Sequence, residues 1–195
     1  MNLTDIWDQL VKTFRSTMAI FGGILLILLI TWVVSKINKA VPHSTIKHST
    51  KGFFKVFKGG GEKPHLASGG HTSKNLRSIS AHHDHYLIQK TFDNGVRLGK
   101  VFPAKKEHDR KDFGHTWFPQ SWKDRDVKRA GLAILLHPKF WFKKKGANIK
   151  FVGRVGDVNI GVKADDGIAK TIYPIYNQTS EEKLHIEKVN HKNGK

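Results

Sequence analysis

The chain has 195 residues, with 34 Lys and Arg against 16 Asp and Glu, which gives a formal net charge of +18 and an isoelectric point of about 10.1. That length has room for one membrane or targeting segment and one globular domain of about 120 to 150 residues, and it excludes a second full domain. The chain contains no cysteine, which excludes disulfide bonds, thiol nucleophiles and cysteine-ligated zinc.

The positive charge lies mostly after residue 40, where 30 Lys and Arg stand against 14 Asp and Glu, an excess of 16. Many weak Lys and Arg contacts attract a polyanion without a precisely shaped surface, so this excess favours a phosphate-bearing partner. A charge that only keeps the protein soluble, or holds it on anionic lipid, is the alternative.

The first hydrophobic feature is an uncharged run of 17 residues from Met18 to Val34. A run of this length is close to the minimum that crosses a bilayer core of ~30 Å, so residues 1–40 are predicted to form a helix with a transmembrane anchor at about 18–37. A cleaved signal peptide is the alternative, but the run is long for one and no A-x-A site follows. The Lys and Arg residues that flank the run favour a single-pass protein with a cytoplasmic C-terminal part.

Residues 41–64 combine lysines with Gly59–Gly61 and have little apolar periodicity, which predicts a flexible basic tether. The globular domain is expected at residues 65–176, followed by a polar C-terminal tail at 177–195.

Within the domain, Tyr86–Phe92 and Val96–Phe102 are apolar-rich runs joined through an Asn-Gly pair, which predicts a β-hairpin. A charged loop is expected at 105–115. A helix is predicted at about 122–136, with Ser121 as its N-cap. Three antiparallel strands are then predicted at 151–155, 158–162 and 168–173.

Three short segments place a histidine or hydroxyl beside residues that fix the backbone: Ser68–Thr72 (SGGHT), His115–Pro119 (HTWFP) and Thr171–Pro174 (TIYP). Histidine titrates near pH 6.5, so it can take up and release protons at neutral pH, and lysine supplies a compact positive charge. Two histidines and one lysine can cleave RNA without metal, by activating its 2′-hydroxyl and protonating the departing 5′-oxygen. His71 is the strongest candidate for one of these histidines, because two glycines before it let a phosphate approach.

These segments, in this order and within a lysine-rich chain, resemble the signature of the bacterial EndoU-like endoribonucleases. The resemblance implies an α+β domain with antiparallel sheets and few helices, as in the RNase A-like superfamily. It also implies cleavage of single-stranded RNA 3′ of uridylate, with 2′,3′-cyclic phosphate ends. Members of the family often serve as bacterial toxins with a dedicated immunity protein. Manganese stimulates some relatives, but the resemblance implies no required cofactor and no metal ligands.

The family has a second histidine upstream, usually in an H-x-x-x-G setting, and two positions in this chain have that spacing. His48 is followed by Gly52 and lies in the expected tether, whereas His65 is followed by Gly69 and lies next to the GGH turn. We predict His65 as the catalytic residue and keep His48 as the alternative. The family lysine precedes the hydroxyl segment, which favours Lys111, with Lys100, Lys105 and Lys106 as alternatives.

The resemblance assigns substrate binding to Thr116, Thr171 and Tyr173. Thr171 and Tyr173 alternate on a strand, so their side chains share one face and can contact one nucleotide. The cluster at His82–His85 suggests zinc, but no further motif completes a set of ligands. The rival hypothesis from another class is a non-catalytic, membrane-tethered binder of nucleic acid or acidic lipid.

Overall fold

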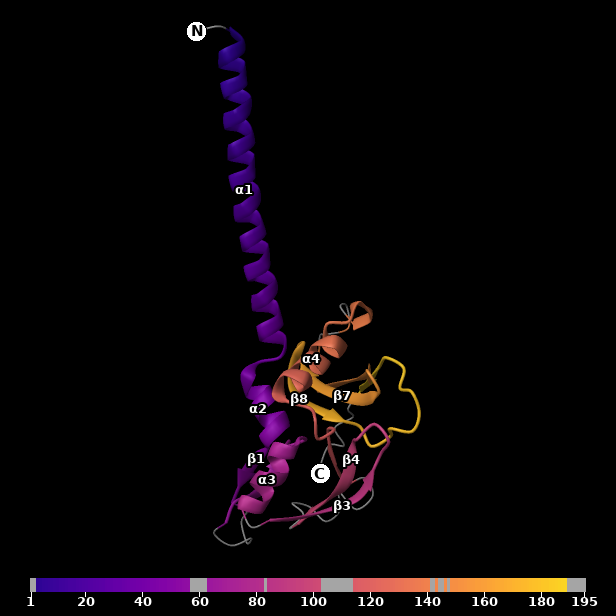
Figure 1. Ribbon diagram of the computed structural model, residues 1–195. Helices are drawn as coiled ribbons and strands as arrows, with labels where there is room; N and C mark the ends of the chain where they lie inside the picture. The colour runs from indigo at the N-terminus through magenta and orange to yellow at the C-terminus, as the bar shows by residue number, and fades with distance from the viewer. Residues whose placement is uncertain are drawn as a thin grey trace. The chain divides into compact units, whose positions relative to one another are not determined.

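The computed structural model describes residues 3–56, 63–82, 84–102, 114–140, 143, 146 and 148–188. The chain divides into two compact units, Met1–Lys39 and Ala40–Lys195. The second unit holds all the described strands, and it has the α+β architecture with antiparallel sheets and few helices that the resemblance implied. Figure 1 shows the elements of both units.

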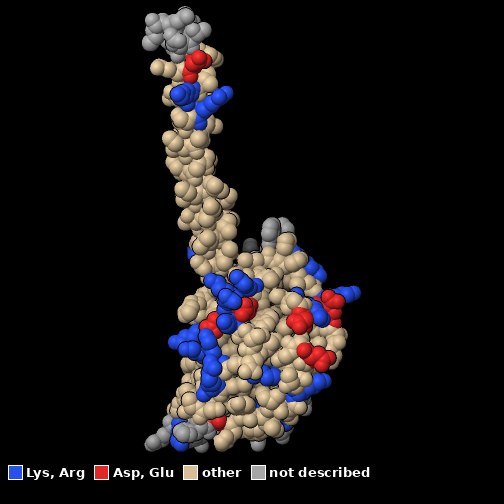
Figure 2. Space-filling view, viewed as in Figure 1, with Lys and Arg blue, Asp and Glu red and all other residues tan. Residues whose placement is uncertain are grey.

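The first unit is formed by the long helix α1 (Leu3–Ala40). Its side chains from Met18 to Val34 are exposed, and Figure 2 shows a long stretch of this helix without charged side chains. The helix is long and apolar enough to cross a membrane, and a signal sequence can have the same length and composition. A helix therefore exists where the anchor was predicted, and its crossing of a bilayer stays a prediction.

The largest described sheet has four antiparallel strands in the order β8-β7-β6-β9. β6 (Ile149–Val155), β7 (Val158–Asp165) and β8 (Ile168–Pro174) confirm the three strands predicted for this region. β9 (His185–Lys188) pairs with β6 and lies where a polar tail was expected. Ile186 of β9 and the preceding Leu184 pack against the core. The sequence did not predict this strand, because these are two apolar side chains among many polar ones.

One face of this sheet is covered by α4 (Asp124–Leu135), as Figure 1 shows. The predicted apolar stripe is confirmed, since Val127, Ala130 and Ile134 are buried. The predicted N-cap at Ser121 is wrong, because residues 119–122 form a turn in which the Trp122 N–H donates to the Pro119 carbonyl at 3.0 Å. The helix starts after Lys123, whose N–H donates to the carboxylate of Asp126 at 2.8 Å. A single 3₁₀ turn, η1 (Pro138–Phe140), follows.

The predicted hairpin is confirmed by β3 (His85–Thr91) and β4 (Arg97–Phe102), which pair antiparallel. Its turn contains Gly95 at φ +78°, the positive value that favours glycine. β5 (His115–Trp117) pairs with β4 and completes a three-stranded sheet. His115 therefore belongs to a strand, whereas residues 105–113 of the expected loop lie outside the described residues.

The segment 41–64, for which we expected a tether, instead contains the helix α2 (His43–Lys51) and the strand β1 (Phe53–Lys55). β1 pairs antiparallel with β2 (His65–Ser68), and the helix α3 (Ser73–Ala81) follows β2. α2 is held mainly by polar contacts with β8: Thr45 Oγ1 donates to the Ala169 carbonyl at 2.5 Å, and the Ile172 N–H donates to Ser49 Oγ at 2.9 Å. A hydrophobic pattern could not predict this helix, because Ile46 is its single large apolar residue.

The described residues of the second unit form two hydrophobic cores. The larger one lies between α4 and the four-stranded sheet and also receives Ile46 from α2. The smaller one is built around Trp117 of β5 and Ile79 of α3. β5 is thus held by its pairing with β4 and by its packing against α3. These contacts keep the HTWFP segment in place.

Candidate active site

A cavity of about 330 Å³ lies where the three sequence motifs meet. Side chains and backbone from α2, the GGH turn, β5 and the sheet strands β6, β7 and β8 line it. The lining residues are His48, Ser68, Gly69, His71, Gly114, His115, Thr116, Lys150, Lys163, Thr171, Tyr173, Pro174, Ile175 and Tyr176. Four of the residues predicted from the sequence are therefore brought together: His71, Thr116, Thr171 and Tyr173.

The GGH turn caps the C-terminal end of α2. A helix leaves its last carbonyl groups without partners inside the helix, and here the carbonyls of residues 49, 50 and 51 find donors from residues 71–75. The His48 carbonyl, which already accepts the Gly52 N–H at 3.0 Å, takes a second donor from this turn. The carbonyls of residues 48 and 49 accept the N–H groups of Gly70 at 2.9 Å and His71 at 2.6 Å. The carbonyls of residues 50 and 51 accept Thr72 Oγ1 at 2.8 Å and Asn75 Nδ2 at 2.9 Å. The turn that carries His71 is therefore docked on the helix that carries His48.

The two glycines are needed for this close approach. Gly69 and Gly70 have φ values of +70° and +75°. A Cβ added at Gly69 would lie 2.9 Å from His48 Nε2, and one added at Gly70 would overlap the side chain of Asn75. The His48 ring thus lies directly against the GGH turn, and burial lowers its pKa below the usual 6.5, because a charged imidazole loses hydration there.

The His71 ring is oriented by β5. Its Nδ1 lies 2.8 Å from the Thr116 carbonyl, which can only accept a hydrogen bond, so Nδ1 carries a proton. In the neutral ring Nε2 is then the nitrogen that can accept a proton. The His71 ring also stacks on the His115 ring, with centroids 4.7 Å apart and planes at 10°. His115 is buried, and its Nε2 lies 2.8 Å from the Gly70 carbonyl.

The HTWFP and TIYP segments are joined by one hydrogen bond, from Thr116 Oγ1 to the Pro174 carbonyl at 2.6 Å. The Tyr173 ring lies 5.6 Å from the His71 ring, centroid to centroid, and packs over Gly161, where an added Cβ would lie 2.8 Å from its Cζ. Burial raises the pKa of the Tyr173 hydroxyl, and the negative charge of Glu187 raises it further. Tyr173 therefore keeps its proton and can donate a hydrogen bond across the neutral pH range.

His65 is not among the residues that line the cavity. Its Nδ1 lies 2.6 Å from Oδ1 of Asp84, whose side chain is fully buried and whose Oδ2 accepts the Leu66 N–H at 3.1 Å. These contacts connect His65 of β2 to the segment between α3 and β3. His48, the alternative position, lines the cavity. Backbone hydrogen bonds connect the end of α2, which carries His48, to the turn that carries His71. The H-x-x-x-G spacing did not predict these bonds.

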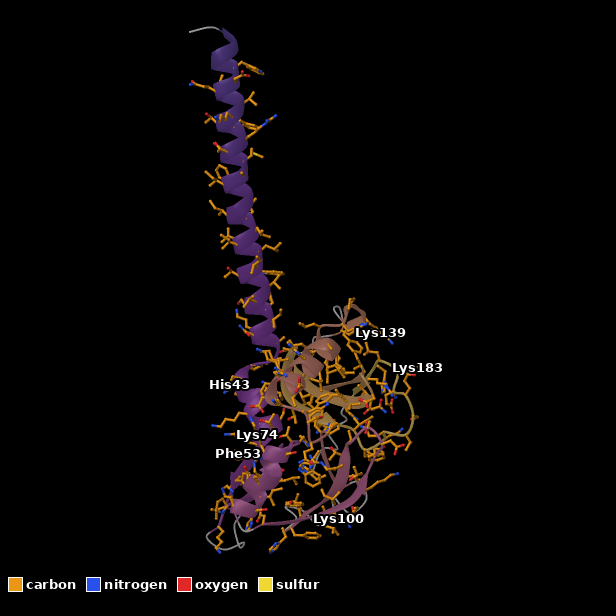
Figure 3. All side chains as sticks on the ribbon, viewed as in Figure 1. His43, Phe53, Lys74, Lys100, Lys139 and Lys183 are labelled. Atoms are coloured by element: carbon orange, nitrogen blue, oxygen red, sulfur yellow. The ribbon has the colours of Figure 1, made fainter. Side chains whose placement is uncertain are left out.

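The described lysines of the cavity are Lys150 and Lys163. The predicted Lys111 and its alternatives Lys105 and Lys106 lie outside the described residues. Lys100 lies on the β3–β4 hairpin, where Figure 3 labels it. It is not among the residues that line the cavity.

Of the histidine cluster considered for zinc, His83 lies outside the described residues, and His82 makes contacts of another kind. The His82 ring stacks on Phe54 with centroids 4.2 Å apart, and its Nδ1 lies 2.7 Å from the Ser78 carbonyl. Among the described residues, no three His, Asp or Glu side chains converge as metal ligands would.

Comparison with known families and proteins bears directly on this site. Residues 49–176 match the family model described as bacterial EndoU nuclease. No curated protein and no solved structure matches the chain. The matched residues run from the last turn of α2 to Tyr176, so they include the GGH turn and the strands from β5 to β8. Because the match covers most of the chain, this protein belongs to the bacterial EndoU nuclease family.

Proposed function

We propose that the protein is a metal-independent endoribonuclease that cleaves single-stranded RNA by attack of the 2′-hydroxyl on the adjacent phosphate. The products are then a 2′,3′-cyclic phosphate and a 5′-hydroxyl, and the cleavage falls 3′ of uridylate. The observation that carries this proposal is the docking of the GGH turn on α2, with His48 and His71 both lining one cavity.

In this reaction one imidazole accepts the proton of the 2′-hydroxyl and the other gives a proton to the departing 5′-oxygen. We therefore propose His48 and His71 as the catalytic pair, in place of His65 and His71. The fixed Nδ1–H of His71 supports this proposal, because it leaves Nε2 as the atom that exchanges protons. Lys111 remains the proposed cation for the phosphorane, on the resemblance alone.

The other proposed roles concern the nucleotide. Tyr173, which keeps its proton, can donate a hydrogen bond to the phosphate or stack on the base. Thr171 lies two residues before it on β8 and faces the same cavity. Thr116 donates its hydroxyl to the Pro174 carbonyl, so its contribution is to hold the end of β8 against β5.

We also propose that the chain is held in a membrane by α1, as a toxin with a cognate immunity protein or as a membrane-tethered nuclease. The apolar length of α1 supports the anchor, and the family membership supports the nuclease.

Product chemistry tests the proposed reaction. The full chain in detergent is incubated with single-stranded RNA in EDTA, and the product ends are identified by mass spectrometry. We expect 2′,3′-cyclic phosphate ends from the wild type and a ~10²- to 10⁴-fold slower reaction from His71→Ala. Intact RNA with folded wild-type protein would support the non-catalytic binder instead.

A further inference from the structure

Two lysines of the cavity have no role in the proposed reaction. Lys150 of β6 lies opposite Lys163 of β7, and Lys163 lies opposite Thr171 of β8. On the far side, Lys150 lies opposite Glu187 of β9. Residues opposite one another in a sheet share a face, so these four side chains form one row across four strands. We refer to Lys150 and Lys163 as the lysine pair.

The two lysines differ in their surroundings. Lys150 Nζ lies 2.7 Å from Glu187 Oε2, and the Lys150 side chain is 18% exposed. Lys163 is exposed, and the ion pairs among the described residues do not include it. Its Nζ lies 5.9 Å from the centroid of the Tyr173 ring. Lys163 therefore presents its positive charge beside Tyr173, at the wall of the cavity.

The lysine pair and the histidines reach the cavity from different elements. The histidines come from α2, the GGH turn and β5, and they meet the sheet at Tyr173, which contacts the His71 ring. The row that contains Lys163 crosses β8 at Thr171, two residues before Tyr173. Two residues along a strand span about 7 Å, and neighbouring strands lie about 5 Å apart, so Lys163 is one strand away from Thr171 and Lys150 is two strands away. The cavity thus has a proton-transfer side and a cationic side, with Tyr173 in contact with both.

We infer that the lysine pair binds a phosphate of the RNA next to the one that is cleaved. A single-stranded substrate whose scissile phosphate lies at the histidines must continue away from them, and a positively charged row of side chains on the same cavity attracts its next phosphate. This inference rests on the proposed function for the identity of the scissile phosphate. It adds a subsite, so it predicts that the enzyme prefers chains longer than a dinucleotide.

Binding tests the subsite without cleavage. The probe is a fluorescent single-stranded oligonucleotide with 2′-O-methyl groups, which lacks the attacking hydroxyl, and its affinity for the full chain in detergent is measured by anisotropy at several salt concentrations. Loss of one phosphate contact reduces the slope of log K against log salt by ~0.7 for a single strand. We expect this reduction for Lys163→Gln and about twice that for the double variant Lys150→Gln/Lys163→Gln.

The matched control is Lys170→Gln. Lys170 is exposed and lies in β8 beside Thr171, yet it does not line the cavity. This variant loses the same charge from nearly the same place, and we expect its slope to equal that of the wild type. An unchanged slope in Lys163→Gln, an equal loss in Lys170→Gln, or no binding by the wild type would each overturn the inference.

Cleavage then shows on which side the additional phosphate lies. The wild type is given a dinucleotide with one phosphate and two trinucleotides, extended at the 5′ or the 3′ end. We expect kcat/KM to rise for one of the two extensions and that gain to disappear in Lys163→Gln but not in Lys170→Gln. A gain that persists in Lys163→Gln, or no gain for either extension, contradicts the subsite. If the wild type cleaves none of the three, the proposed function fails, while the binding measurement still decides on the subsite.

Discussion

The backbone N–H of Gly70 donates a 2.9 Å hydrogen bond to the carbonyl of His48. This bond joins the two parts of the chain that carry the proposed catalytic histidines, although Gly70 lies 22 positions after His48. It belongs to a set of hydrogen bonds from residues 70–75 to the end of α2, so the helix and the GGH turn stabilise each other. The active site therefore depends on the same contacts that allow α2 to form.

Gly70→Ala tests this dependence. The substitution places a Cβ at a residue with φ of +75° and against the side chain of Asn75. Gly156→Ala is a matched control, because Gly156 has φ of +61° but nothing within 4 Å of an added Cβ. We expect Gly156→Ala to cost about 1 kcal/mol of unfolding free energy for the backbone alone. Gly70→Ala should cost about 1–3 kcal/mol more, because the added methyl group overpacks the turn. Urea unfolding measures both, and equal losses would mean that the turn is not tightly docked.

The choice between His48 and His65 is tested by their alanine variants. His48→Ala is expected to slow cleavage ~10²- to 10⁴-fold at nearly unchanged stability, since it removes a proton-transfer group. His65→Ala is expected to keep kcat but to lose about 1–3 kcal/mol of stability, because the buried Asp84 carboxylate loses one of its partners. Single-turnover kinetics and urea unfolding separate the two effects. A slow but stable His65→Ala enzyme, with an active His48→Ala enzyme, would restore the prediction made from the sequence.

The sequence could predict those parts of the fold that carry a local signal. The hairpin has Asn94-Gly95 at its turn, α4 has an apolar stripe, and the three C-terminal strands have apolar runs between turn residues. α2 has no such signal, because its stability comes from hydrogen bonds with residues 70–75 and with β8, far along the chain. The sequence therefore predicts a tether at His48, and the lysine pair can be distinguished from the many other lysines only by the strand register.

The environment of His48 predicts a pH effect. Burial lowers its pKa below 6.5, so the folded protein resists protonation of this ring more than the unfolded chain does. The stability that neutral His48 contributes is present above pH 6.5 and is lost as the pH falls through the lowered folded pKa. We expect the imidazole NMR signal that disappears in His48→Ala to titrate with a midpoint below 6.5. A midpoint at or above 6.5 would show that the ring is hydrated and not held against Gly69.

Tyr173→Phe tests the role of the tyrosine hydroxyl. Because burial keeps this hydroxyl protonated, it can donate to a phosphate oxygen, and a hydrogen bond to a charged group contributes about 1.5–3 kcal/mol. We expect the variant to lose ~10- to 100-fold in kcat/KM and to keep the packing of the ring over Gly161. The measurement is kcat/KM on a uridine-containing oligonucleotide, with circular dichroism as the check on folding. Full activity would leave only a stacking or structural role for Tyr173.

The central claim is that the substrate's own 2′-hydroxyl is the nucleophile. It is tested most directly with a DNA oligonucleotide that contains a single ribouridine, incubated in EDTA with the full chain in detergent. We predict one cut, immediately 3′ of the ribouridine, with a cyclic phosphate on the upstream product, and no cut when that sugar is 2′-deoxy or 2′-O-methyl. Cleavage of the all-deoxy strand, or cleavage at the modified sugar, would contradict it.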